Sequence, residues 1–266
     1  MTEKGILDQS RESEHGVVHM IAGRPVHLPK LDALDLASEP VVRFGAALDI
    51  INETHEAITK IKSDKVLSDF GKDQKLEPLR EALIGRVASQ IEEIDKFAEA
   101  VDRREAALLA VPKIEPQNAA EALVDRELRD WWKEQSSGVR MDLLQKMNEE
   151  PGHERLEIAL LRSPYAQVDR EVALAREAWN NAKRLENPAE AQAIAMWRNQ
   201  NEWATRAFAH FPPITTILSE LPRDRVLGVL LSHGKSNKTI QAFGFDSHTI
   251  ERSKLLAKQR ASSVGR

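Results

Sequence analysis

Apolar side chains recur at every third or fourth position along a stretch from about Leu76 to Val111. The recurring positions are Leu79, Leu83, Val87, Ile91, Ile94, Ala98 and Val101. This spacing keeps them on one face of an α-helix, which completes a turn in about 3.6 residues. At about 1.5 Å per residue such a helix is roughly 50 Å long, which exceeds the needs of a compact domain of this size. The stretch therefore predicts one long helix whose apolar stripe requires a partner.

The nearest partner along the chain is a second amphipathic stretch, from Val41 to Lys62. Its stripe consists of Phe44, Leu48, Ile51, His55 and Ile58. Gly71 and the polar residues 72–75 are predicted to form the connecting turn, and so short a connection favours antiparallel packing. We therefore expect a long helical hairpin over residues 40–111. The shorter helix covers about two thirds of the longer one, so the end near residues 101–109 needs the middle of the chain or another subunit.

The N-terminal residues, ahead of the hairpin, show a different pattern. Residues 1–15 are polar and mixed in charge, a composition typical of disorder in the free chain. Gly16–Ile21 and Pro25–Leu28 flank a glycine-containing turn, which predicts a short β-hairpin or an extended arm within residues 1–39. Because a two-stranded ribbon is marginal alone in water, we expect it to dock on the chain's own body or on another subunit. Its candidate partner-contact residues are Val17, Val18, Met20, Val26 and Leu28.

Several shorter amphipathic segments follow Pro112 and Pro116, which end the long helix. The predicted helices span residues 118–135, 137–150, 153–162, 166–184 and 187–210. All five Trp residues lie between Trp131 and Trp203, so residues 118–211 are predicted to form a compact bundle with its own aromatic core. Adjacent residues of a helix point about 100° apart. One residue of the Trp131-Trp132 pair can therefore be buried while the other faces outward, and Trp132 is the candidate for partner contact.

The last segment begins after a second predicted boundary at residues 211–213, Phe-Pro-Pro. Three short helices are predicted there, over residues 223–233, 236–243 and 247–261, with breaks at Gly234 and Gly244. Residues 222–266 thus form a three-helix unit. The predicted fold class is mainly α: a long helical hairpin, a compact helical bundle and a C-terminal three-helix unit, with the short N-terminal β-hairpin or extended arm.

Composition narrows the class of protein. The charged fraction is 30% and the aromatic fraction 5%, values that favour helices with much exposed surface. Cysteine is absent, which excludes disulfides and thiolate metal sites. No apolar run approaches the roughly 18 residues that a membrane span requires, and the first residues lack the features of a signal peptide. We therefore expect cytoplasmic synthesis, no membrane partner, and either residence in the cytoplasm or incorporation into an assembly such as a virion.

Charge is distributed unevenly along the chain. Residues 222–266 hold nine Lys and Arg against three Asp and Glu, whereas the remainder holds 29 against 39. A basic C-terminal segment on an acidic body is predicted to meet an anion. Nucleic acid is the first such partner, and an acidic neighbouring subunit is the alternative.

The last three predicted helices carry the most specific motif. Residues 230–240 read LLSHGKSNKTI and are followed by SHTI at residues 247–250. This pattern resembles the helix-turn-helix of LuxR-type bacterial regulators, in which Gly-x-Ser-Asn-Lys-x-Ile opens the first helix and Ser-x-x-Thr-Val opens the recognition helix. Relative to that family, Thr249 and Ile250 stand one residue early, so the recognition helix would start in a different rotational register.

The resemblance implies contact with DNA. The residues that would supply phosphate contacts and one or two base contacts are Lys235, Lys238, His248, Arg252, Lys254 and Lys258. A three-helix unit is also a simple structural cap for a helical protein, and both interpretations stay open at this stage.

No catalytic constellation is evident in the sequence. The Gly234-Lys235-Ser236 run lacks the first glycine of a Walker A loop, because position 229 is Val. His15 and His19 lie in a segment that we expect to be extended, where their spacing does not converge on a metal. The carboxylates interleave with bases on predicted exposed faces. We therefore predict no catalytic, cofactor-binding or metal site, and a protein that is not an enzyme.

Residues 124–131, VDRELRDW, and 160–164, LLRSP, are similar in general pattern to uncharacterised helical proteins encoded among the head genes of tailed phages. This resemblance implies a virion component near the capsid, portal or neck, with its basic end toward packaged DNA. The expected function is that of a structural or interaction protein in a larger assembly, with protein subunits as partners. The alternative is a DNA-binding regulator that uses the C-terminal unit.

Overall fold

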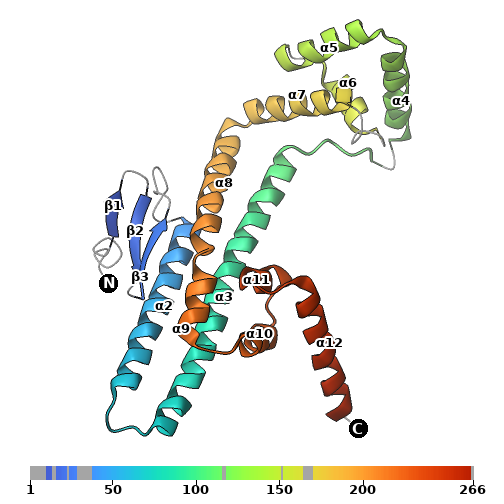
Figure 1. Cartoon of the computed structure of the whole chain (residues 1–266). Coiled ribbons are helices and arrows are strands. Elements are labelled where there is room, and N and C mark those ends of the chain that lie inside the picture. The colour runs from blue at the N-terminus through green and yellow to red at the C-terminus, as the bar shows by residue number, and fades with distance from the viewer. Residues whose placement is uncertain are drawn as a thin grey trace. The chain divides into compact units, whose positions relative to one another are not determined.

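The structure of the chain, a computed structural model, describes residues 10–13, 16–22, 24–28, 38–115, 118–150, 152–163 and 170–264 (Figure 1). The fold is mainly α, as the hydrophobic pattern predicts. The helices are α2 (Glu39–Ser63), α3 (Asp69–Leu108), α4 (Ala119–Glu134), α5 (Ser137–Glu149), α6 (Glu154–Leu161), α7 (Arg170–Glu186), α8 (Pro188–Phe208), α9 (Phe211–Ser219), α10 (Arg223–Ser232), α11 (Asn237–Ala242) and α12 (Ser247–Val264). The strands β1 (Ser10–Ser13), β2 (Gly16–Ile21) and β3 (Arg24–Leu28) form one sheet in that order.

The chain divides into two compact units. The first contains Met1–Glu99 and Trp197–Arg266, and the second contains Ala100–Met196. The chain leaves the first unit within α3 and returns to it within α8. This division differs from the predicted one, since the helical hairpin, the end of the predicted bundle and the C-terminal three-helix unit share one hydrophobic core. The first unit is therefore built from both ends of the sequence.

Helices α2 and α3 form the predicted hairpin of the first unit (Figure 1). The predicted position of its turn is wrong, because residues 71–75 lie inside α3 and the connection is at residues 64–68. The Asp64 carboxylate accepts a hydrogen bond from the Val66 N–H at 2.8 Å, and Ser68 Oγ accepts one from the Gly71 N–H at 3.2 Å. These side chains satisfy backbone groups that a turn and a helix start leave unpaired, which places the break before Gly71.

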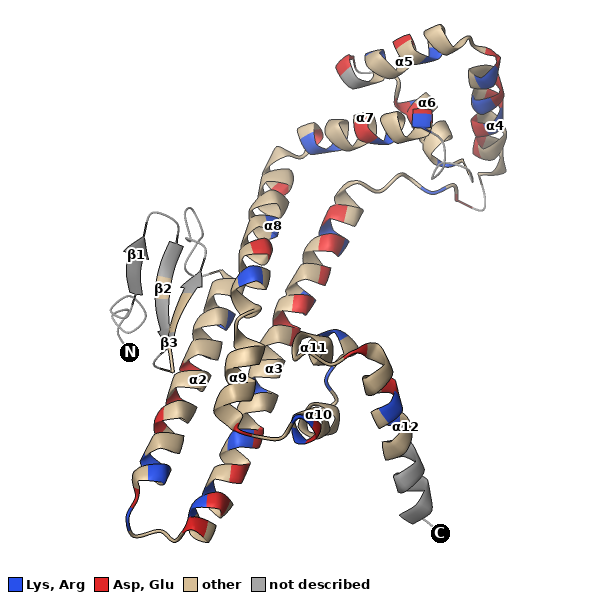
Figure 2. Ribbon diagram, in the orientation of Figure 1, with Lys and Arg blue, Asp and Glu red and all other residues tan. Residues whose placement is uncertain are grey.

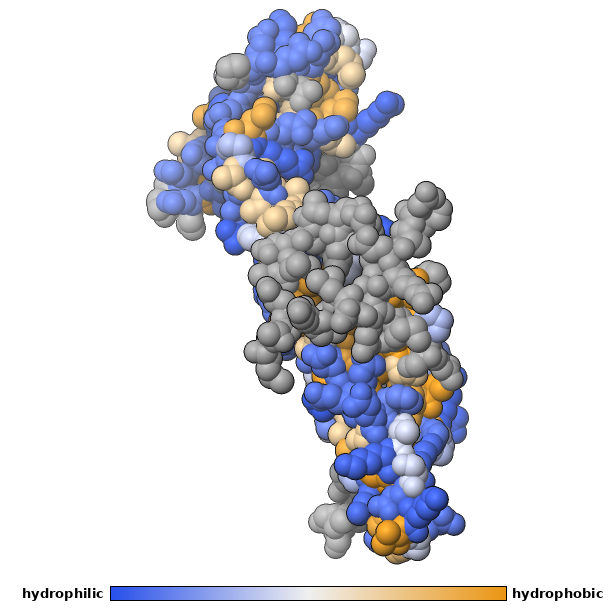
Figure 3. Space-filling model, turned by 90° about the vertical axis from the view of Figure 1, so that its left-hand side faces the viewer, coloured by the Kyte–Doolittle hydropathy of each residue, from blue (hydrophilic) through white to orange (hydrophobic). Residues whose placement is uncertain are grey.

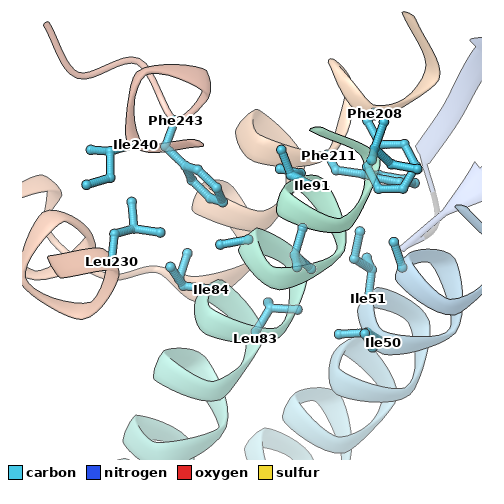
Figure 4. Close-up of a cluster of buried hydrophobic side chains, with 14 of the residues drawn as sticks. Ile50, Ile51, Leu83, Ile84, Ile91, Phe208, Phe211, Leu230, Ile240 and Phe243 are labelled. Atoms are coloured by element: carbon cyan, nitrogen blue, oxygen red, sulfur yellow. The ribbon is translucent and has the colours of Figure 1, made fainter. Parts of the chain in front are cut away.

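Helix α3 has two apolar edges rather than the single predicted stripe. Leu83, on the predicted stripe, lies on the side of α3 that faces Ile51 of α2 (Figure 4). Ile84, one position further on, is fully buried on the other side, where Leu230 of α10 and Ile240 of α11 lie (Figure 4). Helix α3 is therefore the central element of the first unit, with α2 against one edge and the C-terminal helices against the other.

Four aromatic side chains of this core pack against one another: Phe44, Trp203, Phe208 and Phe211. The ring of Phe44 stacks on that of Phe211 at a centroid distance of 5.1 Å, and Trp203 meets Phe44 edge-on at 5.2 Å. Phe211 is fully buried and begins α9, in which the two prolines that follow occupy the first turn, where a missing N–H costs little. Residues 211–213 are therefore a helix start inside a core and not a boundary. Trp203 likewise belongs to this core and not to the predicted tryptophan bundle.

The N-terminal strands confirm the predicted β-hairpin. β2 and β3 pair antiparallel, with Val18 opposite His27. β1 also pairs with β2, so the prediction of disorder is wrong for Ser10–Ser13; residues 1–9, 14 and 15 lie outside the described part of the chain. The pattern missed β1 because its four residues, SRES, are all polar.

The sheet docks on its own chain, one of the two predicted alternatives. Ile21 is fully buried and Val26 is 9% exposed, both within the core of the first unit. The Ala22 N–H donates a hydrogen bond to Asn52 Oδ1 of α2 at 3.0 Å. Val26 is therefore committed to the intramolecular core, which corrects its candidacy for partner contact. Val18 is half-buried, and the side chains of Val17, Met20 and Leu28 lie outside the described part.

The second unit packs α4 to α7 around its own core. Trp179 of α7 is 2% exposed, and its Nε1–H donates to the Leu109 carbonyl, just beyond α3, at 3.1 Å. Arg184 pairs with Glu105 at 3.1 Å. The last turns of α3, for which the sequence suggested either the middle of the chain or another subunit, are therefore covered by the middle of the chain.

Candidate functional site

The three C-terminal helices form at the predicted places. Gly234 and Gly244 separate them and adopt φ angles of 64° and 86°, which only glycine adopts without strain. Ser236 begins α11 as predicted, since its Oγ accepts a hydrogen bond from the Thr239 N–H at 3.1 Å. Side chains from all three helices enter the core of the first unit, so this segment is anchored to the hairpin rather than independent.

The start of α12 is fixed by Asp246. Its carboxylate accepts hydrogen bonds from the Thr249 N–H and hydroxyl, each at 2.8 Å, and these bonds lower the pKa of Asp246. Ile250 is fully buried and sets the rotation of the helix. His248 and Arg252 consequently lie on the exposed face, where a recognition helix would meet DNA.

Two of the candidate DNA-contacting lysines instead contact α3. Lys235 Nζ donates to Ser89 Oγ at 2.8 Å and to Glu92 Oε2 at 3.0 Å, and its side chain is only 9% exposed. Lys238 forms an ion pair with Asp95, one helical turn further along α3. Figure 2 shows acidic positions on α3 beside α11. Glu92 and Asp95 lie one helical turn apart on α3, so both carboxylates reach the start of α11.

The remaining candidates differ in availability. Lys254 Nζ donates to Asn237 Oδ1 at 2.5 Å and lies 3.9 Å from Glu251 Oε1. Arg252 is exposed and, within the described part of the chain, has no hydrogen bond or ion pair. The side chain of Lys258 lies outside the described part. The structure thus does not gather the six candidates into one exposed cationic surface.

Helix α4 carries an exposed face that the sequence interpretation did not single out. Leu123 is 62% exposed, Val124 41% and Trp131 43%, and the helical repeat puts them on one side of α4. Glu127 and Glu134 lie on the same side and are exposed, and among the described residues neither has an ion-pair partner. We call these five residues the α4 face.

The tryptophan pair is oriented opposite to the prediction. Trp132 is 5% exposed, and its Nε1–H donates to Glu171 Oε2 of α7 at 3.2 Å. Trp131 is the exposed member. Trp132 is therefore a core residue, which corrects its candidacy for partner contact. Trp132 is buried because it lies seven residues, or about two turns, after Asp125 and therefore shares the buried side of α4 with it.

In the first unit, two places each expose a pair of large apolar side chains, whereas Val42 and Ile217 are exposed singly. On α12, Leu255 is 58% and Leu256 45% exposed. At the tip of the α2–α3 hairpin, Val66 is 93% and Phe70 73% exposed, and an apolar patch lies at this lower end in Figure 3. Lysines and aspartates alternate around the tip, so its charges do not point to one kind of partner.

A buried carboxylate holds α4 against α6 in the second unit. Asp125 is 1% exposed and forms ion pairs with Arg155 and with Arg162, the latter at 3.1 Å. Arg162 Nε also donates to the Pro112 carbonyl at 2.6 Å. Both arginines thus converge on one carboxylate removed from water, and the contact joins three segments of the chain.

A second buried carboxylate, Glu157 of α6, has no such partner. It is 3% exposed, and its Oε2 accepts no hydrogen bond from the described residues. Burial raises its pKa to about 7; the neighbouring Glu154 adds to the shift and Lys183 opposes it. The ionised form of Glu157 therefore destabilises the folded state.

Two open hollows lie on the surface of the described residues. One, of about 290 Å³, lies between α5 and α7 and is lined by Met141, Asp142, Leu144, Gln145, Leu174, Glu177 and Ala178. The other, of about 400 Å³, lies between α2 and α3 and is lined by Ala46, Asp49, Ile50, Glu53, Arg86, Ser89 and Gln90. Within the described ranges, no three His, Asp or Glu side chains are placed to hold a metal ion. None of the helices there is long and apolar enough to cross a membrane.

Comparisons with known proteins were made at three levels. No family model, no curated protein and no solved structure matches this chain. The surfaces described above are therefore the basis for a proposed function.

Proposed function

We propose that this chain is a non-enzymatic structural or interaction subunit of a larger assembly. Exposed large apolar side chains support this proposal, because such patches on a folded chain mark sites of protein contact. They lie on α4 and α12 and at the hairpin tip, and they include Trp131, a residue type that is enriched at the energetic centres of interfaces. We propose a virion as the specific assembly because residues 124–131 and 160–164 resemble tailed-phage head-gene products in general pattern.

The observation that carries this proposal is that lysines of the C-terminal helices bind groups of their own chain. A DNA-binding surface needs cations free to replace the counterions of phosphates. The Lys235 side chain is 9% exposed and pairs with Glu92 of α3, whereas Lys238 and Lys254 contact Asp95 and Asn237 through side chains that are 73% and 37% exposed. A structural role for the three-helix unit, anchored on α3, accounts for these contacts.

Sedimentation tests the assembly proposal. A tagged full-length chain, expressed in its source and passed through a density gradient, should travel with particles much larger than the free 29.9 kDa chain. Nuclease treatment before the gradient should leave this distribution unchanged, because the proposed contacts are with protein. If the chain stays at the position of free protein, the proposal is wrong; if nuclease releases it, nucleic acid is the partner.

A DNA-binding regulator is the second candidate, favoured by the helix-turn-helix arrangement of α11 and α12. A regulator should bind its operator duplex about 10³-fold or more above background, with steep salt dependence. Arg252→Ala combined with Lys254→Ala should then abolish specific binding. We expect instead weak, sequence-blind binding that this double variant changes little. Selection of bound duplexes from a random pool, followed by titration, distinguishes the two results.

A further inference from the structure

The α4 face, composed of Leu123, Val124, Glu127, Trp131 and Glu134, combines exposed apolar side chains with two carboxylates that have no ion-pair partner among the described residues. Its two carboxylates face outward beside exposed apolar side chains. Asp130, at its edge, already pairs with Arg126 and Lys133 of the same helix. The unpaired charge of this face is thus negative. A complementary surface has to be apolar and positively charged.

Helix α12 presents such a surface. His248, Arg252, Leu255 and Leu256 are exposed, and the helical repeat puts them on one side. We call these four residues the α12 face. Among the described residues Arg252 has no ion-pair partner; His248 lies one turn before it, and the apolar area comes from the two leucines. Cationic and apolar groups therefore occur here in the arrangement that the α4 face needs.

Charge selects between the pairings that two copies of the chain could make. A two-fold pairing of α4 with itself, centred on the face, brings Glu127 against its own copy. A two-fold pairing of α12 with itself gathers Arg252 and His248 of both copies. Like charges in such positions oppose association. Pairing of α4 from one copy with α12 from another instead places opposite charges together around an apolar centre.

We propose that the α4 face of one copy binds the α12 face of a second copy. The contact is heterologous, so each copy keeps one face free after the first contact and the chain can continue into a ring or an open filament. This inference rests on the proposed assembly function and names its partner. A single pair of helix faces forms a small interface, so we expect association in the micromolar range.

Two variants, each defective in one face, test the head-to-tail contact. The first carries Glu127→Arg and Glu134→Arg, and the second carries Arg252→Ala and Leu256→Ala. In light scattering after size exclusion, the wild-type chain should form species larger than dimers as its concentration rises. Each variant alone should remain monomeric. Mixed in equal amounts, the two should form a dimer and nothing larger, because the first offers an intact α12 face and the second an intact α4 face.

Matched controls separate these effects from general changes in charge or apolar area. Glu53→Arg with Glu56→Arg makes the same charge change on exposed positions of α2 and should associate as the wild type does. Leu185→Ala removes an 82% exposed leucine outside both faces and should also have no effect. Trp131→Ala should weaken association about tenfold or more, as truncation of a central aromatic residue does. Circular dichroism checks that each variant is folded.

Three results would overturn the proposal. They are a wild-type chain that stays monomeric at every concentration, a mixture of the two variants that does not form dimers, and control variants that lose association equally. None of them depends on the gradient experiment on the assembly. A chain that sediments with particles but fails the mixing test would retain the proposed function through another partner, and head-to-tail dimers without particles would retain the contact alone.

Discussion

Replacing Asp125 by alanine should lower the free energy of unfolding of the second unit by about 3–5 kcal/mol. The substitution removes the carboxylate on which Arg155 and Arg162 converge. Arg162 keeps only the longer pair with Glu121, at 3.4 Å, and is 12% exposed, so water compensates its charge poorly. Urea unfolding measures the loss, and hydrogen exchange should localise it to α4 and α6.

Asp130→Ala is the control for this prediction, because it removes the same side chain from the same helix. Asp130 is 53% exposed and pairs with Arg126 and Lys133, also on the surface. Exposed pairs contribute little, so the expected loss is below about 1 kcal/mol. Equal losses for the two variants would mean that the buried network does not hold α4 to α6.

Replacing Glu157 by glutamine should raise the free energy of unfolding of the second unit by roughly 2–3 kcal/mol at pH 8. Glutamine keeps the shape of the side chain but cannot ionise. The wild-type chain at pH 8 has to bury a carboxylate whose Oε2 accepts no hydrogen bond from the described residues. The variant avoids this cost, and urea unfolding at pH 8 measures the gain.

The direction in which stability changes with pH follows from the raised pKa of Glu157. Folding raises the pKa of Glu157 from 4.5 to about 7, so between these values the folded state holds a proton that the unfolded state has released. The contribution to stability is thus fully present below pH 4.5, falls as pH rises through this window, and is lost above about 7. The Glu157→Gln variant should lack this contribution to the fall in stability between pH 4.5 and 7. Equal pH profiles for the two proteins would contradict the assignment.

Glu154→Gln provides a graded test of the cause. Glu154 is an exposed neighbour whose charge adds to the pKa shift, whereas burial is the larger cause. This variant should therefore reduce the pH dependence between pH 4.5 and 7 without removing it. Complete loss of the dependence would mean that repulsion between the two carboxylates, rather than burial, sets the pKa of Glu157.

Local patterns predicted the elements of the fold well. The spacing of Leu83, Val87 and Ile91 identified α3, because a stripe on one face is a property of consecutive residues. Gly234 and Gly244 marked the ends of short helices for the same local reason. The β-hairpin was also recognisable from its β-branched residues.

Contacts between distant segments were not predictable in this way. Ile84 is not on the predicted stripe, and it forms a separate edge of α3 that is covered by residues near the C-terminus. From the sequence, Asp125 was expected on an exposed face, because its partners lie at least 30 positions away: Arg155 in α6 and Arg162 directly after α6. The lysines of the candidate DNA surface were recognised as cations, but Glu92 and its role in pairing them depended on the tertiary fold.

The split of the first unit between the two ends of the sequence sets an order of folding during synthesis. A ribosome adds about 5–20 residues per second, so the roughly one hundred residues of the second unit occupy it for about 5–20 s. That unit has all its residues once Met196 is made, whereas the α2–α3 hairpin still lacks α9 to α12. Through this interval the edge of α3 that contains Ile84 has no cover from its own chain. During this interval a chaperone or another copy of the chain can therefore contact the uncovered edge of α3 in the nascent hairpin.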